Sequence, residues 1–212
     1  GGDGLGGLSS HLRKLSREYH VLAIDPDFLS QDFHEQILQV RSFCTADDGY
    51  IIANSYGAYL FLHSLIARAP LQASALLLSP VLGRVNSEKR MLISRPPGEK
   101  RFKRAVSDGS LGLPAVARIV TGEDDEVCDS QLAAHISSQL NIELEVLIGE
   151  GHMISPAKVA AAVDAFLQLE GLAIAKLNVE LLAEVGKSSR RAHVELLFLR
   201  QVWNEEGRLH VH

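Results

Sequence analysis

Residues 50–66, YIIANSYGAYLFLHSLI, contain a short apolar run, a serine flanked by small residues, and a second, longer apolar run. The first run predicts a buried strand and the second a buried helix, with a tight turn at Ser55 between them. Ala53 and Gly57 lie two residues before and after the serine, so no bulky Cβ obstructs such a turn. The turn would lift the Ser55 hydroxyl to a helix N-terminus, where N–H groups favour developing negative charge.

A second serine fits the same spacing, in Ala105-Val106-Ser107-Asp108-Gly109. It follows a charged run at residues 99–104 and no strand precedes it, so we interpret Ser107 as a surface serine. For Ser55 the alternative is a serine that only caps a buried helix. The flanking strand and helix favour Ser55 over Ser107 as a reactive group.

Composition limits the classes of protein that this chain can represent. It has 212 residues, 46% of them hydrophobic, and a formal net charge of −5. These values predict one main domain and argue against a nucleic-acid-binding protein, and no apolar run is long enough to span a membrane. Cys44 and Cys128 lie in unrelated contexts, which predicts reduced thiols in a cytoplasmic protein, with no disulfide framework and no structural metal.

The first seven residues include five glycines. Leu8, Leu12, Leu15 and Tyr19 follow at helical spacing, so we interpret the glycines as a loop that leads into an amphipathic helix. A flexible tail is the alternative. Because such a loop normally follows a strand, and the chain does not begin with methionine, the sequence predicts an incomplete N-terminus.

Strand and helix patterns alternate along the rest of the chain. Strands are expected near residues 21–24, 50–53, 75–78, 116–120 and 144–148, and helices near residues 33–40, 56–69, 130–140 and 155–166. The strands are almost unbroken apolar runs, except the last, which has one polar face that is typical of a sheet edge. This order predicts an α/β fold with a mostly parallel sheet covered by helices on both faces.

Residues 82–113 interrupt this alternation without sustained periodicity, and they carry eight basic and three acidic residues. Long irregular connections are often lids or binding loops, although a solvated surface loop is the alternative. If this segment lies over Ser55, basic residues such as Lys100, Arg101 and Arg104 would steer anionic acyl substrates towards the site.

A serine hydroxyl needs a base and an orienting carboxylate to act as a nucleophile. Asp125 follows a strand in the pattern Gly122-x-x-Asp125, and His152 follows the last strand directly after Gly151. Carboxyl ends of parallel strands meet at one sheet edge, so both residues should converge on Ser55. Asp124 is the rival carboxylate.

Each partner also has an ordinary interpretation. The acidic run at residues 123–126 could be a solvated turn or a weak cation site, and His152 could be an unreactive loop histidine. The order of glycine loop, Ser55 turn, Asp125 loop and His152 loop resembles that of the α/β-hydrolase superfamily over roughly residues 1–170.

This resemblance implies a small serine hydrolase with a short lid. Ser55, Asp125 and His152 would form the triad, and N–H groups of Tyr56 and of Gly2 or Asp3 would form the oxyanion hole. The implied substrates are small acyl compounds, either carboxylic esters or thioesters, and no metal or organic cofactor is implied. Ala53 and Asn54 replace the glycine and histidine that are frequent in the family, and they identify no subfamily.

Residues 172–212 extend beyond the predicted hydrolase core at residues 1–171. Their apolar positions predict a helical hairpin packed on the core or on a second copy, which would make a homo-oligomer; these positions include Leu177, Leu181, Leu197 and Phe198. Two other functions remain open: a peptidase or amidase of the same fold, and a non-catalytic interaction protein that uses this hairpin.

Overall fold

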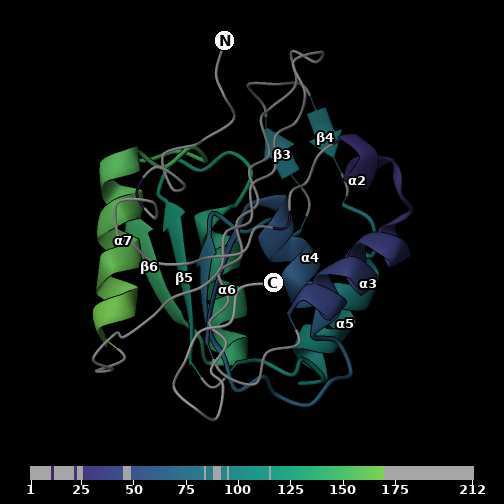
Figure 1. The fold of residues 1–212 in the computed structure, drawn as a ribbon. Coiled ribbons are helices and arrows are strands. Elements are labelled where there is room, and N and C mark those ends of the chain that lie inside the picture. Colours follow the sequence, from purple (N-terminus) through teal and green to yellow (C-terminus); the bar gives the residue numbers. More distant parts are fainter. Residues whose placement is uncertain are drawn as a thin grey trace, which may run out of the picture.

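The computed structural model describes residues 11, 22, 26–44, 49–83, 85–87, 92–94, 96–114 and 116–169 (Figure 1). Among the elements described, two helices come first and are followed by strands and helices in alternation. The elements are α2 (Pro26–Ser30), α3 (Phe33–Phe43), β1 (Tyr50–Asn54), α4 (Tyr56–Ser64), β2 (Ser74–Leu78), β3 (Val85–Ser87), β4 (Leu92–Ser94), α5 (Glu99–Ser107), β5 (Val116–Gly122), α6 (Ser130–Leu140), β6 (Glu143–Leu147) and α7 (Pro156–Leu169).

The main sheet is parallel and has the strand order β1-β2-β5-β6 among the described strands. Asn54 pairs with Leu78, and Leu78 with Val120, so these three strands end nearly level with one another. Residues that follow the strands therefore gather at one edge of the sheet. β6 lies at an end of this sheet and is only half-buried, as its polar face predicted.

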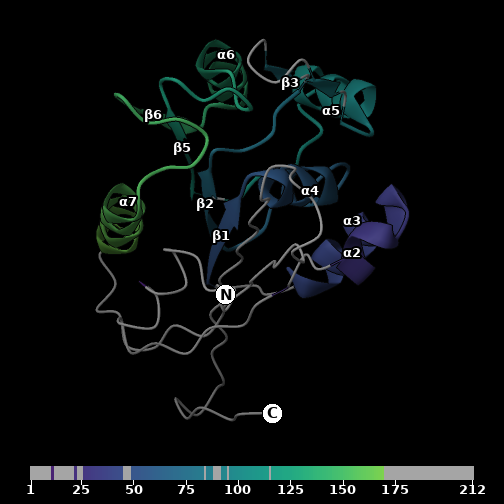
Figure 2. The ribbon, with the colours of Figure 1, turned by 90° about the horizontal axis from the view of Figure 1, so that it is seen from above.

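Helices cover both faces of the sheet, which confirms the predicted fold class (Figure 2). Alternate strand residues divide between two apolar clusters because successive side chains point to opposite faces. Ile51, Leu77 and Ile119 join the larger cluster with α3, α4 and α6. Ile52 and Leu76 join the smaller cluster, which packs against α7.

Helix α4 ends at Ser64, earlier than expected. The chain after it pairs with a distant segment instead: Ala67 N donates to Ser110 O at 2.8 Å, and Gly112 N donates to Leu65 O at 3.0 Å. These long-range contacts satisfy the backbone groups that a longer helix would have used. The local apolar periodicity could not show that pairing with residues 110–112 would replace the last turn of the helix.

The expectation of an irregular segment at residues 82–113 is wrong for α5. Phe102 is fully buried, and Ala105 and Val106 follow at helical spacing and are also buried. Two basic residues, Lys103 and Arg104, separate Phe102 from Ala105, and two more precede Phe102, which obscured the helical period. Before α5, the short strands β3 and β4 pair antiparallel.

Several predictions fall outside the described residues. They include the glycine loop at residues 1–7, most of the helix that follows it, the strand at 21–24 except Leu22, and the hairpin at 172–212. The boundary at residue 171 and the homo-oligomer stay predictions. Within the part of the chain that is described, no helix has the length and apolar character needed to cross a membrane.

Candidate active site

Ser55 occupies the turn between β1 and α4 with φ 52° and ψ −123°, in the left-handed half of backbone space that a non-glycine residue seldom adopts. Three backbone hydrogen bonds hold it there: Ser55 N donates to Leu78 O at 2.9 Å, and Ser55 O accepts from Val81 N at 3.2 Å and from Tyr59 N at 3.3 Å. The side chain makes no capping bond to α4, so its hydroxyl is not used as a helix cap. The strand-to-helix turn predicted at Ser55 is confirmed.

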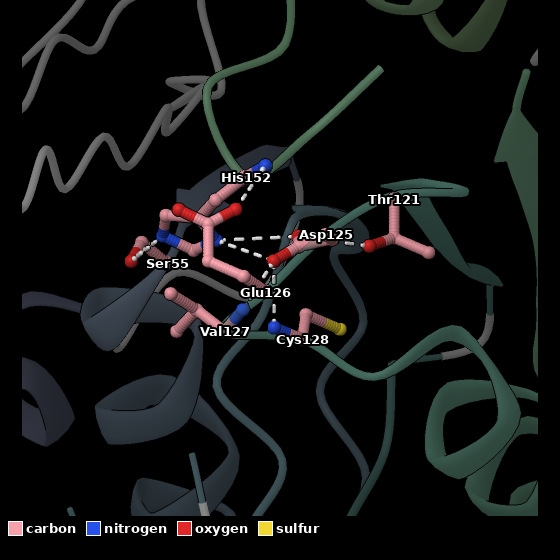
Figure 3. Close-up of polar contacts among 7 residues, drawn as sticks. All are labelled: Ser55, Thr121, Asp125, Glu126, Val127, Cys128 and His152. Carbon is pink, nitrogen blue, oxygen red and sulfur yellow. Dashed lines mark hydrogen bonds and ion pairs between the residues drawn. The ribbon is translucent and has the colours of Figure 1, made fainter. Parts of the chain in front are cut away.

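Ser55, His152 and Asp125 form one connected chain of polar contacts (Figure 3). Ser55 Oγ lies 2.8 Å from His152 Nε2. On the other side of the imidazole ring, His152 Nδ1 lies 3.0 Å from Asp125 Oδ1 and 3.2 Å from Asp125 Oδ2. The structure thus brings together the three side chains that the sequence placed at separate strand ends.

Asp125 is almost fully buried and its carboxylate accepts bonds from several directions. Val127 N and Cys128 N donate to Oδ1 at 2.8 and 2.7 Å, and Thr121 Oγ1 donates to Oδ2 at 3.1 Å. Burial by itself would raise the pKa of Asp125, but the hydrogen bond and charge of His152 and the two backbone donors outweigh it and lower the pKa. The carboxylate is therefore held in its ionised form.

Asp124, the rival acid, is exposed and has a different contact. Its backbone N–H donates to Glu150 O at 2.9 Å, on the loop that carries His152. The prediction that Asp125 rather than Asp124 contacts the imidazole is confirmed. Among the described residues no group of three or more acidic, histidine or cysteine side chains is arranged to hold a metal ion.

Two contributors escaped the sequence analysis. Thr121, the penultimate residue of β5, donates to the Asp125 carboxylate, and Glu126 Oε2 accepts a long bond of 3.4 Å from His152 N.

Gly122 allows a close approach between the end of β5 and the histidine loop, because a Cβ at this position would lie 2.2 Å from Glu150 O. The glycine therefore lets the end of β5 touch the histidine loop. The Gly122-x-x-Asp125 pattern was the only signal for this close approach.

The predicted oxyanion donors are only partly described. Tyr56 is the first residue of α4, where backbone N–H groups have no acceptor within the helix. It directly follows Ser55 in the chain, and its role as an oxyanion donor stays a prediction. Gly2 and Asp3 lie outside the described residues.

The basic residues of α5 do not surround Ser55, contrary to the expectation. Arg101 lies near enough to Arg41 to lower its pKa, and Arg41 binds Ser64 O at the C-terminal end of α4. Ser55 lies at the opposite end of that helix. In Figure 1, α5 lies low in the molecule, away from the ends of β5 and β6 that carry the site. The segment's other basic residues, Arg84, Lys89, Arg90 and Arg95, lie outside the described residues, so the preference for anionic acyl substrates stays a prediction.

Comparisons with solved structures found distant likenesses. A carboxylesterase from the thaumarchaeon Nitrososphaera gargenis is 14% identical over 66% of this chain and 72% of its own, with a TM-score of 0.45. A variant of SOBER1 from Arabidopsis thaliana is 16% identical over 69% of this chain and 70% of its own, with a TM-score of 0.41.

A protein described as a YdeN-like hydrolase, from Pectobacterium atrosepticum, is 13% identical over 76% of this chain and 99% of its own, with a TM-score of 0.42. No curated protein matches the sequence.

A family model identifies the family of this chain. The model for serine hydrolases matches residues 14–161, which is well over half of the chain and includes all three contacting side chains. The chain belongs to this serine hydrolase family and has an α/β-hydrolase fold.

Proposed function

We propose that this serine hydrolase cleaves carboxylic esters or thioesters of small acyl compounds, with Ser55 as nucleophile, His152 as base and Asp125 as orienting acid. The observation that carries the proposal is the contact chain from Ser55 Oγ through the imidazole to the Asp125 carboxylate. Ser55 is only 2% exposed, which shelters the proton transfer from bulk water.

The ionised Asp125 favours the imidazole tautomer that carries its proton on Nδ1, which leaves Nε2 to accept the Ser55 proton. As Oγ bonds to the acyl carbon, the carbonyl electrons move to oxygen, beside the Tyr56 N–H. When the carbonyl re-forms, His152 returns the proton to the departing alcohol or thiol. Water then repeats both steps on the acyl-enzyme and releases the carboxylic acid and free Ser55.

Labelling with a fluorophosphonate probe, followed by peptide mapping, tests the nucleophile. We expect label on Ser55 alone in the full chain, and we expect Ser55→Ala to lose turnover on the order of a million-fold while remaining folded. Ser107→Ala is the matched control because Ser107 is exposed and its hydroxyl donates to Lys103 O within α5. Label on Ser107 would contradict the assignment. A folded protein that takes no label would favour the non-catalytic interaction protein.

The leaving group is tested with matched esters, thioesters and anilides of one acyl group. We expect kcat/KM for the ester and thioester to exceed that for the anilide. The opposite order would favour the peptidase or amidase, with the same nucleophile. Since α5 lies away from Ser55, the anionic members of such a series are not expected to gain from its charges.

A further inference from the structure

His152 lies on the histidine loop, residues 148–155, which joins the end of β6 to the start of α7. Residues 148–155 contain neither helix nor strand. The regular hydrogen bonds of a helix or a sheet therefore do not fix the imidazole, although it has to lie within hydrogen-bonding distance of both Ser55 and Asp125. Bonds made by side chains in or next to this loop must supply that order.

The side chain of Glu150 forms a bridge across this loop. Glu150 Oε2 accepts a hydrogen bond from Ser155 N at 2.8 Å, and Oε1 accepts one from Ser155 Oγ, also at 2.8 Å. His152 lies between these two residues in the chain, so the bridge closes the backbone on both sides of the histidine into a ring. Ser155 O accepts from Val159 N at 3.0 Å, which joins this ring to the first turn of α7.

The Glu150 carboxylate is ionised and lies next to a cation. Lys158 Nζ lies 3.4 Å from Glu150 Oε1 and donates to Ile148 O at 3.0 Å. The backbone and hydroxyl donors of Ser155, and then Lys158, lower the pKa of Glu150. Hydrogen bonds to an ionised acceptor are stronger than bonds between neutral groups. The two short bonds of the bridge are therefore strong contacts within the histidine loop.

The backbone of Glu150 connects the same loop to the segment that carries Asp125. Asp124 N donates to Glu150 O at 2.9 Å, and Asp125 follows directly in the chain. Glu150 is thus bonded through its carbonyl to the acid segment and through its carboxylate to the far end of the histidine loop. Loss of the carboxylate would keep the bond from Asp124 but would release the chain between Glu150 and Ser155, which includes His152.

We propose that Glu150 is a positioning residue for His152: its carboxylate bridges the histidine loop and thereby keeps the imidazole between Ser55 and Asp125. This inference rests on the proposed function, in which His152 is the base. A displacement of about 1 Å in a catalytic group can lower the rate by about a hundredfold, so a bridge outside the substrate site still affects turnover. It affects kcat rather than KM, because Glu150 acts through His152 and not on the substrate.

Turnover of one ester is measured for three variants of the full chain. Glu150→Ala removes the bridge, and we expect kcat to fall by about tenfold to a hundredfold with KM changed by less than about twofold. Glu150→Gln keeps an acceptor for Ser155 N and can donate to Ser155 Oγ, so most of kcat should return. Glu143→Ala is the matched control and should leave kcat unchanged. It removes an exposed carboxylate of β6, and Arg118 keeps its contact with Glu145.

Proton NMR gives a measurement that does not depend on turnover. The Nδ1 proton of His152, which is bonded to Asp125, should give a downfield resonance that is missing in His152→Gln. In Glu150→Ala this resonance should shift or broaden, whereas Glu150→Gln and Glu143→Ala should retain it. The resonance reports the imidazole position whether or not esters are the substrate. Failure of the ester assignment is therefore distinguishable from failure of this inference.

Ser155→Ala replaces Glu150→Ala if urea unfolding shows that the latter does not fold. It removes one of the two donors to the carboxylate, so kcat should fall by about fivefold to tenfold, again with a change in the His152 resonance. An unchanged resonance in the folded variant would overturn the proposal even if kcat fell, because the bridge would then only support the fold. A natural kcat in that variant would overturn it as well.

Discussion

At the scale of single residues, Asp125 and Asp124 provide a matched pair. Asp125→Asn keeps the shape of the side chain but can donate to the imidazole, which favours the wrong tautomer, so we expect kcat to fall by roughly ten-thousand-fold. Asp124→Asn should leave kcat unchanged because its side chain is exposed and does not contact His152. Steady-state kinetics on one ester compare kcat in the two variants. Loss in Asp124→Asn without loss in Asp125→Asn would reverse the assignment.

Thr121 is expected to position the acid rather than to touch substrate. Its buried hydroxyl donates to Asp125 Oδ2 and also hydrogen-bonds Cys128, whose pKa burial raises to about 12, so that this thiol stays protonated. Thr121→Val should lower kcat by about tenfold with KM unchanged, because one hydrogen bond to an ionised group is lost. Thr121→Ser should restore the rate. Equal loss in both variants would indicate a packing defect instead.

At the scale of elements, the joint between β5 and the histidine loop depends on Gly122. An alanine Cβ would lie 2.2 Å from Glu150 O, so Gly122→Ala must push that loop away from β5 and draw His152 away from Asp125. We expect both a lower free energy of unfolding, measured in urea, and a lower kcat.

Gly109→Ala is the control for this substitution. Gly109 has a positive φ, of 63°, and a Cβ there meets nothing within 4 Å. The substitution Gly109→Ala should therefore lower the free energy of unfolding by only about 1 kcal/mol, through backbone strain, and leave kcat unchanged. If Gly122→Ala kept full activity, the close contact would not position His152.

At the scale of the whole molecule, His63 links three helices through their packing. It is fully buried on α4, with ring centroids 4.4 Å from Tyr59, 4.9 Å from Phe33 and 5.6 Å from Phe102. Neither ring nitrogen has a hydrogen-bond partner among the described residues. Burial, and to a lesser extent the charge of Arg101, lower its pKa from 6.5 to about 4.

This lowered pKa predicts how stability depends on pH. Between pH 6.5 and about pH 4 the unfolded chain binds a proton at His63 that the folded chain does not bind. Stability is therefore complete above pH 6.5 and falls as the pH drops towards 4, by roughly 3 kcal/mol. Urea unfolding across this range should show the loss. The variant His63→Phe should remove this pH dependence of the free energy of unfolding, whereas His135→Gln, at an exposed position, should retain it.

Asp125 affects the stability of the fold in a lower pH range than His63. Because its pKa in the folded protein lies below the ordinary 3.8, the stability that its ionised form contributes is present above that value and is lost only in stronger acid. A loss of stability above pH 4 that persisted in His63→Phe would show that another group titrates there.

The sequence by itself determined the features that depend on neighbours along the chain. Small residues around Ser55 allowed the turn, apolar runs marked the strands, and the carboxyl ends of parallel strands had to bring Asp125 and His152 to the same edge. The periodic signal was lost where charges interrupted it, as in α5, and the short elements α2, β3 and β4 gave none.

Tertiary structure alone decided which polar atoms meet across distant segments. The contacts of Thr121 with Asp125, of Gly122 with Glu150 and of Arg41 with Ser64 all depend on how helices and loops pack. These contacts form or fail over distances of less than an ångström. Periodicity reports which face of an element is buried, but it carries no information about the position of one element relative to another.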